Sequence, residues 1–491
     1  MAPPVPGVEV AVDQREPGPH RFRTRRTSRA IGSCTVTKTS CRRAAGALLR
    51  RDRLLRQAEC PVPDRHGRTT RVLAAVVALM ALAGGACTGD PGGQVGSGMA
   101  TTAPRPAPTV GVDQPGDRPP APALPPAIPS RTELPKPLKA VWVHLFDNAL
   151  KTRAGVNRVL DDAASAGVNA VFLQVVRRQD AYYGSQVLPP TPDPALAPSF
   201  DVLRAAVDGG RARGIQIHAW FTVATAWHES YRDLELPAGH ITRDHGPGTA
   251  DPWMTVSRTG AQSREYFDIG LPELHDHVAG VVADIAGRYA VDGVHLDYVR
   301  YDGPQWGYHP RALQRFAAET GYRGMPAPSE PVWAGWRRAQ SRAIVERARA
   351  ALAQARPQAL LSAAVIAQGP GPGAAGGFRE TRAFVDYAQD WAAWVDEGLL
   401  DLAVPMVYMR ESSAEQAQWF RQWLAFAGDL DQRPAGAAVA AGVGGWLNAV
   451  AGAVVQAREA LSRTSGVVVF SYQQDSADRA RGSFLRELGG I

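Results

Sequence analysis

The residues best suited to chemistry lie in the segment 291–301, VDGVHLDYVRY. Side chains alternate between the two faces of a β-strand. One face would carry Gly293, His295, Asp297 and Val299, and the other Val294, Leu296 and Tyr298. Because Val294 and Leu296 suit packing against an outer helix, we expect His295 and Asp297 to point towards the axis of a barrel.

Asp297 is the candidate catalytic residue of this segment. An ionised carboxylate on a buried strand is costly unless it is paired or used. The carboxyl ends of the strands of a (β/α)8 barrel face its active-site mouth. We therefore predict a catalytic role for Asp297, with a structural ion pair to Arg300 as the alternative.

The apolar pattern of residues 140–488 predicts such a barrel. Eight apolar runs, interpreted as strands, cover residues 140–146, 168–176, 215–223, 291–299, 360–366, 402–408, 437–441 and 467–472. Amphipathic helices are predicted at residues 153–166, 200–213, 272–289, 331–355, 379–397, 413–427, 448–463 and 476–488. Alternating strands and helices indicate a parallel sheet, and no GxGxxG loop follows the first strand. We predict an α/β fold of the (β/α)8 TIM-barrel type.

The ends of the predicted strands are rich in aromatic, amide and charged side chains, which suit a sugar-binding cleft better than a phosphate site. The predicted substrate-binding residues are Asp180, Tyr182, His218, Trp220, Trp227, His295, Arg300, Tyr301, Tyr408 and Tyr472. Trp227 belongs to the long segment 224–270, whose aromatic content favours a substrate-binding wall. A simple cover over the barrel rim is the alternative.

No cofactor or metal site is predicted. His275 and His277 are two residues apart, so on a helix they point away from each other, and we interpret them as a solvated helix face. An HExxH motif is absent from the sequence. All four cysteines lie at or before Cys87, which leaves the predicted barrel without a disulfide or a thiol nucleophile.

Charge is distributed unevenly along the chain. Of the 54 Lys and Arg and the 47 Asp and Glu, residues 1–71 hold 16 and 6, which leaves 38 and 41 for the remainder. The formal net charge of +7 therefore originates in the N-terminal part. It gives no reason to expect nucleic-acid binding by the barrel.

The N-terminal part has the layout of an exported protein. A basic run and an apolar stretch precede Cys87, as in a secretory signal peptide. The sequence LAGGAC resembles a bacterial lipobox, in which Cys87 would be lipidated and anchor the protein to the outer face of the membrane; ordinary secretion is the alternative. The predicted divisions are a basic extension or misplaced start at 1–64, a signal segment at 65–87, a Pro- and Gly-rich tether at 88–138 and the barrel at 139–491.

Six motifs are spread in order over residues 139–475: QVVRRQDAYYGS, GIQIHAW, YFDIGLPEL, VDGVHLDYVRY, LAVPMVYM and VVVFSY. Together they resemble the bacterial glycosyl hydrolase-like family 10, also called DUF187. The resemblance implies a (β/α)8 barrel, an exported form and glycosidase activity on bacterial polysaccharide, with peptidoglycan glycan strands as the substrate of some relatives. Asp297 matches the family pattern, whereas Asp302 stands where that pattern usually has proline.

Glycoside cleavage generally needs two carboxyl groups, one that stabilises or attacks the oxocarbenium-like centre and one that protonates the leaving oxygen. We assign the first role to Asp297. For the second we choose Glu411, since aromatic neighbours could raise its pKa. Asp302, Glu229 and Asp180 are competing acids. An N-acetyl group of the substrate could also act as the nucleophile, with Asp297 orienting it.

The sequence thus predicts an exported glycoside hydrolase that acts on a bacterial cell-wall or extracellular polysaccharide. A carbohydrate-binding lipoprotein that does not cut glycan is the first alternative, and a metal-dependent hydrolase on the same barrel is the second. The expected partner is the polysaccharide, and nothing in the sequence indicates an oligomeric state.

Overall fold

The computed structural model describes residues 130–491 except 147, 228–233, 374–375, 435, 473–484, 486 and 488. The predicted basic extension, the signal segment with Cys87 and most of the tether lie outside the described residues. So do Glu229 and most of the helix predicted at 476–488. Over the part of the chain that is described, no helix combines the length and the apolarity needed to cross a bilayer.

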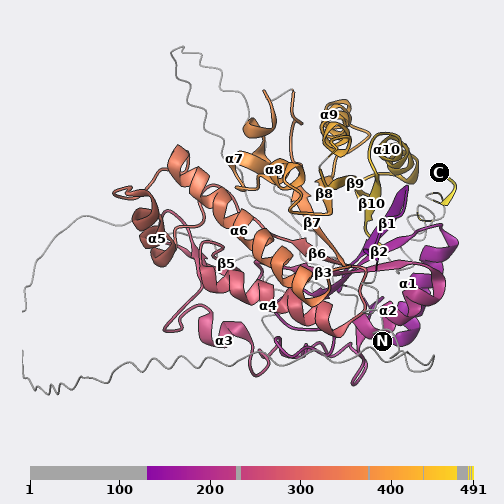
Figure 1. The fold of residues 1–491 in the computed structure, drawn as a ribbon, viewed down its shortest axis with the longest axis horizontal. Helices are drawn as coiled ribbons and strands as arrows, with labels where there is room; N and C mark the ends of the chain where they lie inside the picture. The colour runs from indigo at the N-terminus through magenta and orange to yellow at the C-terminus, as the bar shows by residue number, and fades with distance from the viewer. Residues whose placement is uncertain are drawn as a thin grey trace, which may run out of the picture. The chain divides into compact units, whose positions relative to one another are not determined.

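Eight parallel strands close into a barrel in the order β1-β10-β9-β8-β7-β6-β3-β2 (Figure 1). They are β1 (Leu138–Val143), β2 (Ala170–Val176), β3 (Gln216–Thr222), β6 (Gly293–Asp297), β7 (Leu360–Ile366), β8 (Leu402–Val407), β9 (Ala438–Gly444) and β10 (Gly466–Phe470). The predicted TIM-type barrel is confirmed, with every strand at its predicted place in the sequence. The register pairs Thr222 with Asp297, so the carboxyl ends of β3 and β6 lie side by side.

Helices surround the barrel, and the long helices α4 and α6 run next to each other on the side of β6 (Figure 1). The helices are α1 (Arg153–Ser165), α2 (Val202–Arg213), α3 (Ile241–His245), α4 (Pro272–Arg288), α5 (Pro310–Thr320), α6 (Pro331–Ala355), η2 (Phe378–Glu380), α7 (Arg382–Val385), α8 (Trp391–Asp396), α9 (Ala414–Asp431) and α10 (Val450–Arg463). Local sequence explains their ends. The Asp201 side chain accepts a hydrogen bond from the Arg204 backbone N–H at the start of α2, and Gly214 at φ 68° ends it.

One prediction of a helix was wrong. The single helix predicted at 379–397 is divided into η2, α7 and α8. Thr381, in an extended conformation, separates η2 from α7, and Ala388, in a left-handed conformation with φ 50°, lies between α7 and α8. The break lets Gln389 accept a hydrogen bond from Ile366 N and donate one to Val299 O. The long segment 224–270 contains α3 and an antiparallel hairpin of β4 (Met254–Val256) and β5 (Gln262–Phe267).

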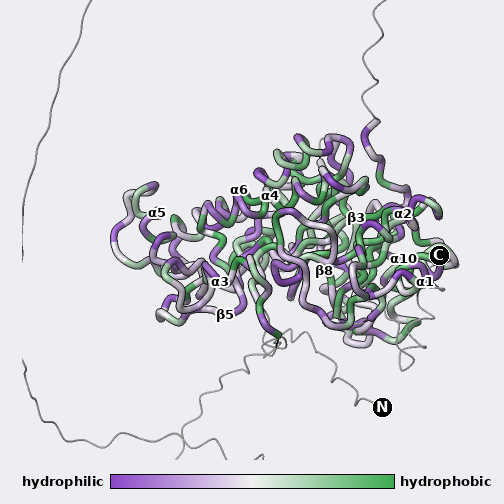
Figure 2. Tube along the Cα trace, turned by 90° about the horizontal axis from the view of Figure 1, so that it is seen from below, coloured by the Kyte–Doolittle hydropathy of each residue, from purple (hydrophilic) through white to green (hydrophobic). Residues whose placement is uncertain are grey.

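The barrel interior is filled by alternate side chains of the strands, as predicted for His295. Trp142 Nε1 donates to His295 Nε2 at 3.0 Å, and His295 Nδ1 lies 2.9 Å from Ser362 Oγ. Val294 and Leu296 are fully buried in the outer layer between strands and helices. Figure 2 shows hydrophobic segments of the chain in the inner part of the domain and hydrophilic segments mainly on its outer turns. Alternation along β6 therefore has the predicted direction as far as Asp297.

Residues 130–137 contact the end of the barrel opposite its mouth. The backbone N–H of Thr132 donates to Gln358 O at 2.9 Å, and Gln216 Nε2 donates to Glu133 O at 2.7 Å. Leu134 packs against the inner core of the barrel. This short segment, just ahead of the boundary predicted at 139, thus covers the lower opening of the barrel.

Candidate active site at the barrel mouth

Asp297 is the last residue of β6, and its side chain is 8% exposed. Its Oδ2 accepts a hydrogen bond from Trp220 Nε1 at 3.2 Å, and its Oδ1 accepts one from the Tyr298 backbone N–H at 2.7 Å. Arg300 Nη1 lies 3.5 Å from Oδ1, at the outer limit of a hydrogen bond. Burial raises the pKa of Asp297, while Arg300 and the two hydrogen bonds act in the opposite direction. The carboxylate therefore lies at the barrel mouth with a loose cationic partner.

Tyr298 does not continue the alternation of β6, which corrects its predicted place beside Val294 and Leu296. Its φ of 58° puts the backbone in the left-handed region, which is costly for a residue with a side chain. The Tyr298 ring stacks on Tyr266 with centroids 5.9 Å apart and planes at 18°, and the Arg300 guanidinium carbon lies 3.9 Å from the Tyr298 ring centroid. The turn thus brings Tyr298 to the lining of the hollow, while the side chain still packs against the core cluster that contains Val294 and Leu296.

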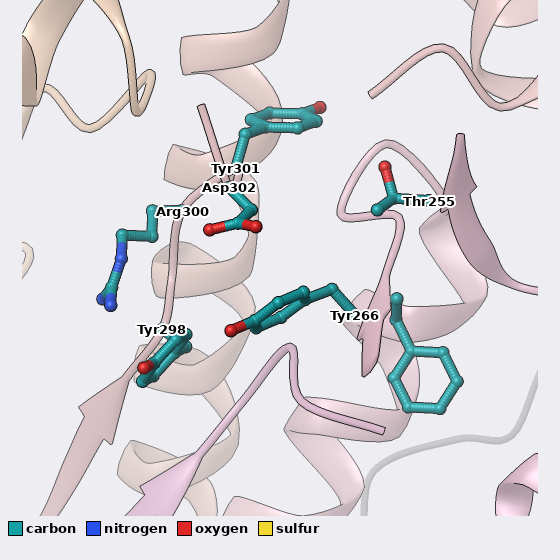
Figure 3. A pocket seen from close by; sticks show the side chains of 7 residues that line it. Thr255, Tyr266, Tyr298, Arg300, Tyr301 and Asp302 are labelled. Carbon is teal, nitrogen blue, oxygen red and sulfur yellow. The ribbon is translucent and has the colours of Figure 1, made fainter. Parts of the chain in front are cut away.

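A small hollow lies against the loop that follows Asp297, and its lining includes Arg300, Tyr298 and Asp302 but not Asp297 itself. The residues that line it are Thr255, Tyr266, Phe267, Tyr298, Arg300, Tyr301 and Asp302. In Figure 3 the carboxylate of Asp302 lies above the ring of Tyr266, and the Arg300 side chain runs down on the left, on the side of Tyr298. Its volume of about 10 Å³ is enough for one water molecule and too small for a sugar ring.

Asp302 offers a second carboxyl in this hollow. The residue is exposed at the rim, yet enough protein surrounds the carboxyl that burial raises its pKa. The charge of Glu265 adds to this rise and that of Arg300 opposes it. A carboxyl with a raised pKa can hold a proton at a higher pH than an ordinary aspartate, which is the property needed of a proton donor.

Aromatic rings extend from Asp297 across the mouth. The ring of Phe470, at the end of β10, has its centroid 6.4 Å from that of Trp220, 5.8 Å from Tyr408 and 5.9 Å from His144. Burial and the charge of Asp297 raise the pKa of Tyr408 well above its usual value, so its hydroxyl stays protonated. Apolar rings around a few polar groups are typical of small-molecule sites. Of these residues, Phe470 was not predicted to be part of the site, although it belongs to the motif VVVFSY and to a predicted strand.

Glu411, the predicted proton donor, has other partners. Its Oε1 accepts a hydrogen bond from Arg421 Nη2 at 2.7 Å, and its Oε2 accepts one from Gln456 Nε2 at 3.1 Å. Arg421 also pairs with Glu459 at 2.8 Å. Over the described part of the chain, the structure gives Glu411 no contact with Asp297 or Arg300. The side chain is thus tied to α9 and α10 rather than to the hollow.

Several predicted substrate-binding residues are buried and bonded to internal partners. Asp180 forms an ion pair with Arg178 at 2.6 Å, and both side chains are inaccessible. The hydroxyl of Tyr182 donates to Asp193 Oδ2 at 2.7 Å, and that of Tyr472 donates to Asp162 Oδ2 at 2.7 Å. These contacts indicate structural roles, because a buried side chain with internal partners cannot reach a glycan in this conformation.

The remaining predicted residues are divided between interior and mouth. His218 is fully buried against the ring of Phe172, and burial lowers the pKa of His218 to about 4, so it is neutral. His295 and Tyr301 are buried as well. Trp227 is partly exposed and contacts His240. The structure therefore brings together Asp297, Trp220, Arg300 and Tyr408 from the predicted set.

The expectation of a solvated His275 and His277 was wrong for His275. It is buried, and its Nε2 lies 2.7 Å from Ile269 O, because α4 packs this face against the barrel. His277 Nε2 lies 3.1 Å from Gln179 Oε1. Within the described residues, no three or more His, Cys, Asp or Glu side chains gather as metal ligands would.

Comparisons with known proteins agree with this architecture. "Glycosyl hydrolase DigH" of Escherichia coli O6:H1 is 25% identical over 352 residues, which are 62% of this chain and 73% of the relative. "Glycosyl hydrolase YngK" of Bacillus subtilis is 24% identical over 289 residues, which are 55% of this chain and 54% of that relative. The chain thus spans about half the length of YngK.

Solved structures share the fold at low sequence identity. The PgaB (BpsB) glycoside hydrolase domain from Bordetella bronchiseptica aligns with a TM-score of 0.52 and 16% identity, covering 72% of this chain and 98% of that one. The catalytic domain of a β-amylase from Paenibacillus polymyxa aligns with a TM-score of 0.50 and 11% identity, over 72% and 99%. At these identities the likeness shows the TIM-barrel fold alone.

The family model described as Glycosyl hydrolase-like 10 matches residues 137–428. This range includes β6 with Asp297, the residues that line the hollow and the loop that follows β8. More than half of the chain is covered, and the resemblance seen in the six sequence motifs is confirmed. The protein therefore belongs to the glycosyl hydrolase-like 10 family.

Proposed function

We propose that the protein is an exported glycoside hydrolase that cleaves a bacterial cell-wall or extracellular polysaccharide. The observation that carries this proposal is Asp297, a largely buried carboxylate at the carboxyl end of a barrel strand. Its contacts with Trp220 and Arg300 leave it at the mouth, where TIM-barrel enzymes keep their chemistry. Membership of a family with relatives named glycosyl hydrolases supports the same reaction class.

In the proposed reaction Asp297 stabilises or attacks the oxocarbenium-like centre, and a second carboxyl protonates the leaving oxygen. Asp302 fits the second role, because it lines the hollow and burial raises its pKa. Its competitors fit less well. Glu411 and Asp180 are held by the guanidinium groups of Arg421 and Arg178, and neither of them lines the hollow. Since the family pattern usually has proline at position 302, this assignment would be particular to this chain.

A glycan would approach Asp297 from the rim. The hollow accommodates one water molecule, which is the size of the nucleophile that completes hydrolysis. The sugar ring would lie outside it, near the rings of Tyr408 and Phe470. Denuded peptidoglycan strands are the first substrate to test.

Export rests on the sequence ahead of the barrel. The signal-like segment 65–87 and the tether 88–138 would place the barrel outside the cell membrane. Lipidation of Cys87 would anchor it there, and cleavage without lipidation would release it. Mass spectrometry of the mature N terminus distinguishes these two forms.

The test compares Asp297→Asn with Asp292→Asn, a matched control at the opposite end of the β6 segment. Asp292 comes directly before the first residue of β6, whereas Asp297 is the last residue of that strand. The Oδ2 atom of Asp292 accepts a hydrogen bond from Ile217 N at 2.8 Å. Full-length protein is incubated with denuded peptidoglycan strands and other polysaccharides, and new reducing ends are measured. We expect release by the wild type, a loss on the order of 10³-fold for D297N, and a change within about threefold for D292N. Full activity of D297N would refute the assigned role.

A binding protein that does not cut glycan is the second candidate. Two observations favour binding without cleavage. Glu411 is engaged in an ion pair with Arg421, and the hollow is too small to hold a sugar next to a proton donor. Retention of the wild type on insoluble peptidoglycan without any new reducing ends would support binding alone. A loss of activity on chelation would instead indicate a metal-dependent hydrolase.

A further inference from the structure

Arg337 of α6 contacts the loop that follows β6 from the side away from the barrel mouth. Its side chain is inaccessible to solvent, and its Nη2 donates to Gly303 O at 2.8 Å. Its guanidinium carbon lies 4.2 Å from the ring centroid of Tyr301. Arg300 and Asp302, which line the hollow, flank Tyr301 in the chain. Arg337 therefore contacts Tyr301, which itself lines the hollow between Arg300 and Asp302, and Gly303, which follows Asp302.

The Tyr301 ring is held from a second direction by Gly307. This glycine has φ 102°, a conformation that residues with a side chain rarely adopt. A Cβ atom at Gly307 would lie 2.5 Å from a ring carbon of Tyr301. The Gly307 N–H also donates to Thr255 Oγ1 at 3.1 Å, which ties the loop to the β4–β5 hairpin. In Figure 3 the ring of Tyr301 leaves the loop on a different side from Arg300.

This arrangement is poor for stability alone. Within the described residues, Arg337 has no carboxylate partner, and its Nε and Nη1 form no hydrogen bond. The hydroxyl groups of Tyr301 and Tyr308 also have no hydrogen-bond partner in that part of the structure. The nearby carboxylate of Asp268 is engaged by Gly270 N at 2.8 Å and Thr255 Oγ1 at 3.0 Å. Burying a cation without a paired anion destabilises a fold. Because such costs are expected at functional sites, the buried Arg337 indicates a role in the function of the loop that it contacts.

We propose that Arg337 is a positioning residue of the active-site mouth. By fixing Tyr301 and Gly303, it fixes Arg300 and Asp302 and keeps the Arg300 guanidinium next to Asp297. The inference rests on the proposed function and deepens it, because it assigns the geometry of the hollow to a helix outside the barrel.

The test uses full-length protein with Arg337→Met and the matched control Arg338→Met. Methionine keeps much of the volume of the side chain and removes the buried charge. Arg338 is the next residue of α6, and its guanidinium carbon lies 3.9 Å from the Phe384 ring centroid, away from the loop. For R337M we expect kcat to fall roughly 10- to 100-fold, because small misplacements of reacting groups cost about that much, while the melting temperature stays equal or rises. R338M should keep both values, and R337K should restore part of kcat.

The pH profile gives a readout that a purely structural role would not change. The groups that face Asp297 are Arg300 and Tyr298 from its own loop, Trp220 from β3 and Tyr408 directly after β8. Arg300 is the cation among them. If R337M lets Arg300 move away, Asp297 loses its stabilising charge, and the acid limb of kcat/KM shifts to higher pH.

Three outcomes decide the inference. The inference is supported if R337M lowers kcat, shifts the acid limb to higher pH and keeps the melting temperature. It is overturned if R337M has the kcat of the wild type. It is also overturned if R338M loses as much kcat as R337M. Hydrogen exchange of the amides in residues 298–309 provides a check that is independent of catalysis. If the wild type cuts no glycan, the proposed function fails, but faster exchange in R337M than in R338M still supports positioning, and unchanged exchange rejects it.

Discussion

Asp297 is the last residue of one barrel strand and Glu411 lies just beyond the end of another, yet their surroundings differ. Asp297 contacts Trp220 and, at 3.5 Å, Arg300, and its side chain lies at the mouth with a raised pKa. Glu411 lies beyond β8, where its two carboxylate oxygens accept hydrogen bonds from Arg421 at 2.7 Å and from Gln456 at 3.1 Å. A strand end thus locates an acidic residue near the rim without determining which way it faces.

The difference arises from the segments that follow the two strands. After β6 the chain turns at Tyr298 into the left-handed region, and the next residues line the hollow. After β8 the Glu411 backbone N–H donates to Asn448 Oδ1 at 2.7 Å, which draws this residue towards α10. The helices that cover the barrel therefore decide which rim carboxylate is available for chemistry.

The largest effect that separates the two regions is expected from Asp302→Asn compared with Glu411→Gln. If Asp302 donates the proton, D302N should lower kcat on a substrate with a poor leaving group by on the order of 10²-fold. E411Q should change kcat less than about threefold, because its carboxylate is committed to Arg421. Reducing-end assays of both variants, with circular dichroism to confirm folding, provide the measurement. A large loss in E411Q with an intact D302N would restore Glu411 as the acid.

The sequence was sufficient to predict the barrel and the place of Asp297 at the end of a strand. Both depend on local patterns, since apolar runs of strand length indicate the barrel and alternation along 293–297 determines the face that Asp297 shares. The partners of Glu411 could not be predicted in this way. Arg421 and Gln456 lie 10 and 45 residues further along the chain, and only packing of α9 and α10 brings them to the same carboxylate.

Other differences have the same origin. Alternation predicted an outward Tyr298, but a positive φ at a residue other than glycine leaves no clear sign in the sequence. The aromatic content of 224–270 favoured a substrate wall, and the hairpin of β4 and β5 does place Tyr266 against Tyr298. Nothing in the local pattern distinguished Tyr266 from Trp227, which contacts His240 instead.

A smaller effect is expected in the pH dependence. Asp297 must be ionised to act on the sugar, and burial raises its pKa, so activity should fall as the pH drops through a value above the ordinary 3.8. Asp302 must carry a proton, and its pKa is also raised, so activity should fall as the pH rises through its own raised value. A bell-shaped kcat/KM profile therefore follows.

The two variants assign the limbs of this profile. D302N should remove the alkaline limb, since an amide does not titrate, and E411Q should leave both limbs in place. An alkaline limb that persists in D302N and is lost in E411Q would identify Glu411, and not Asp302, as the proton donor.

The smallest effect concerns stability at the Glu411 site. Breaking the contact with Arg421 removes an ion pair whose arginine side chain is 39% exposed, and pairs of this kind contribute about 0.5 kcal/mol in water. Arg421 would keep its pairing with Glu459, which limits the loss further. Urea unfolding of E411Q should therefore show a free energy of unfolding within about 1 kcal/mol of the wild type. Added salt should reduce this difference, because it screens the ion pair that is present only in the wild type. A larger loss that salt does not reduce would mean that Glu411 supports the β8 end through Gln456 and α10 rather than through charge.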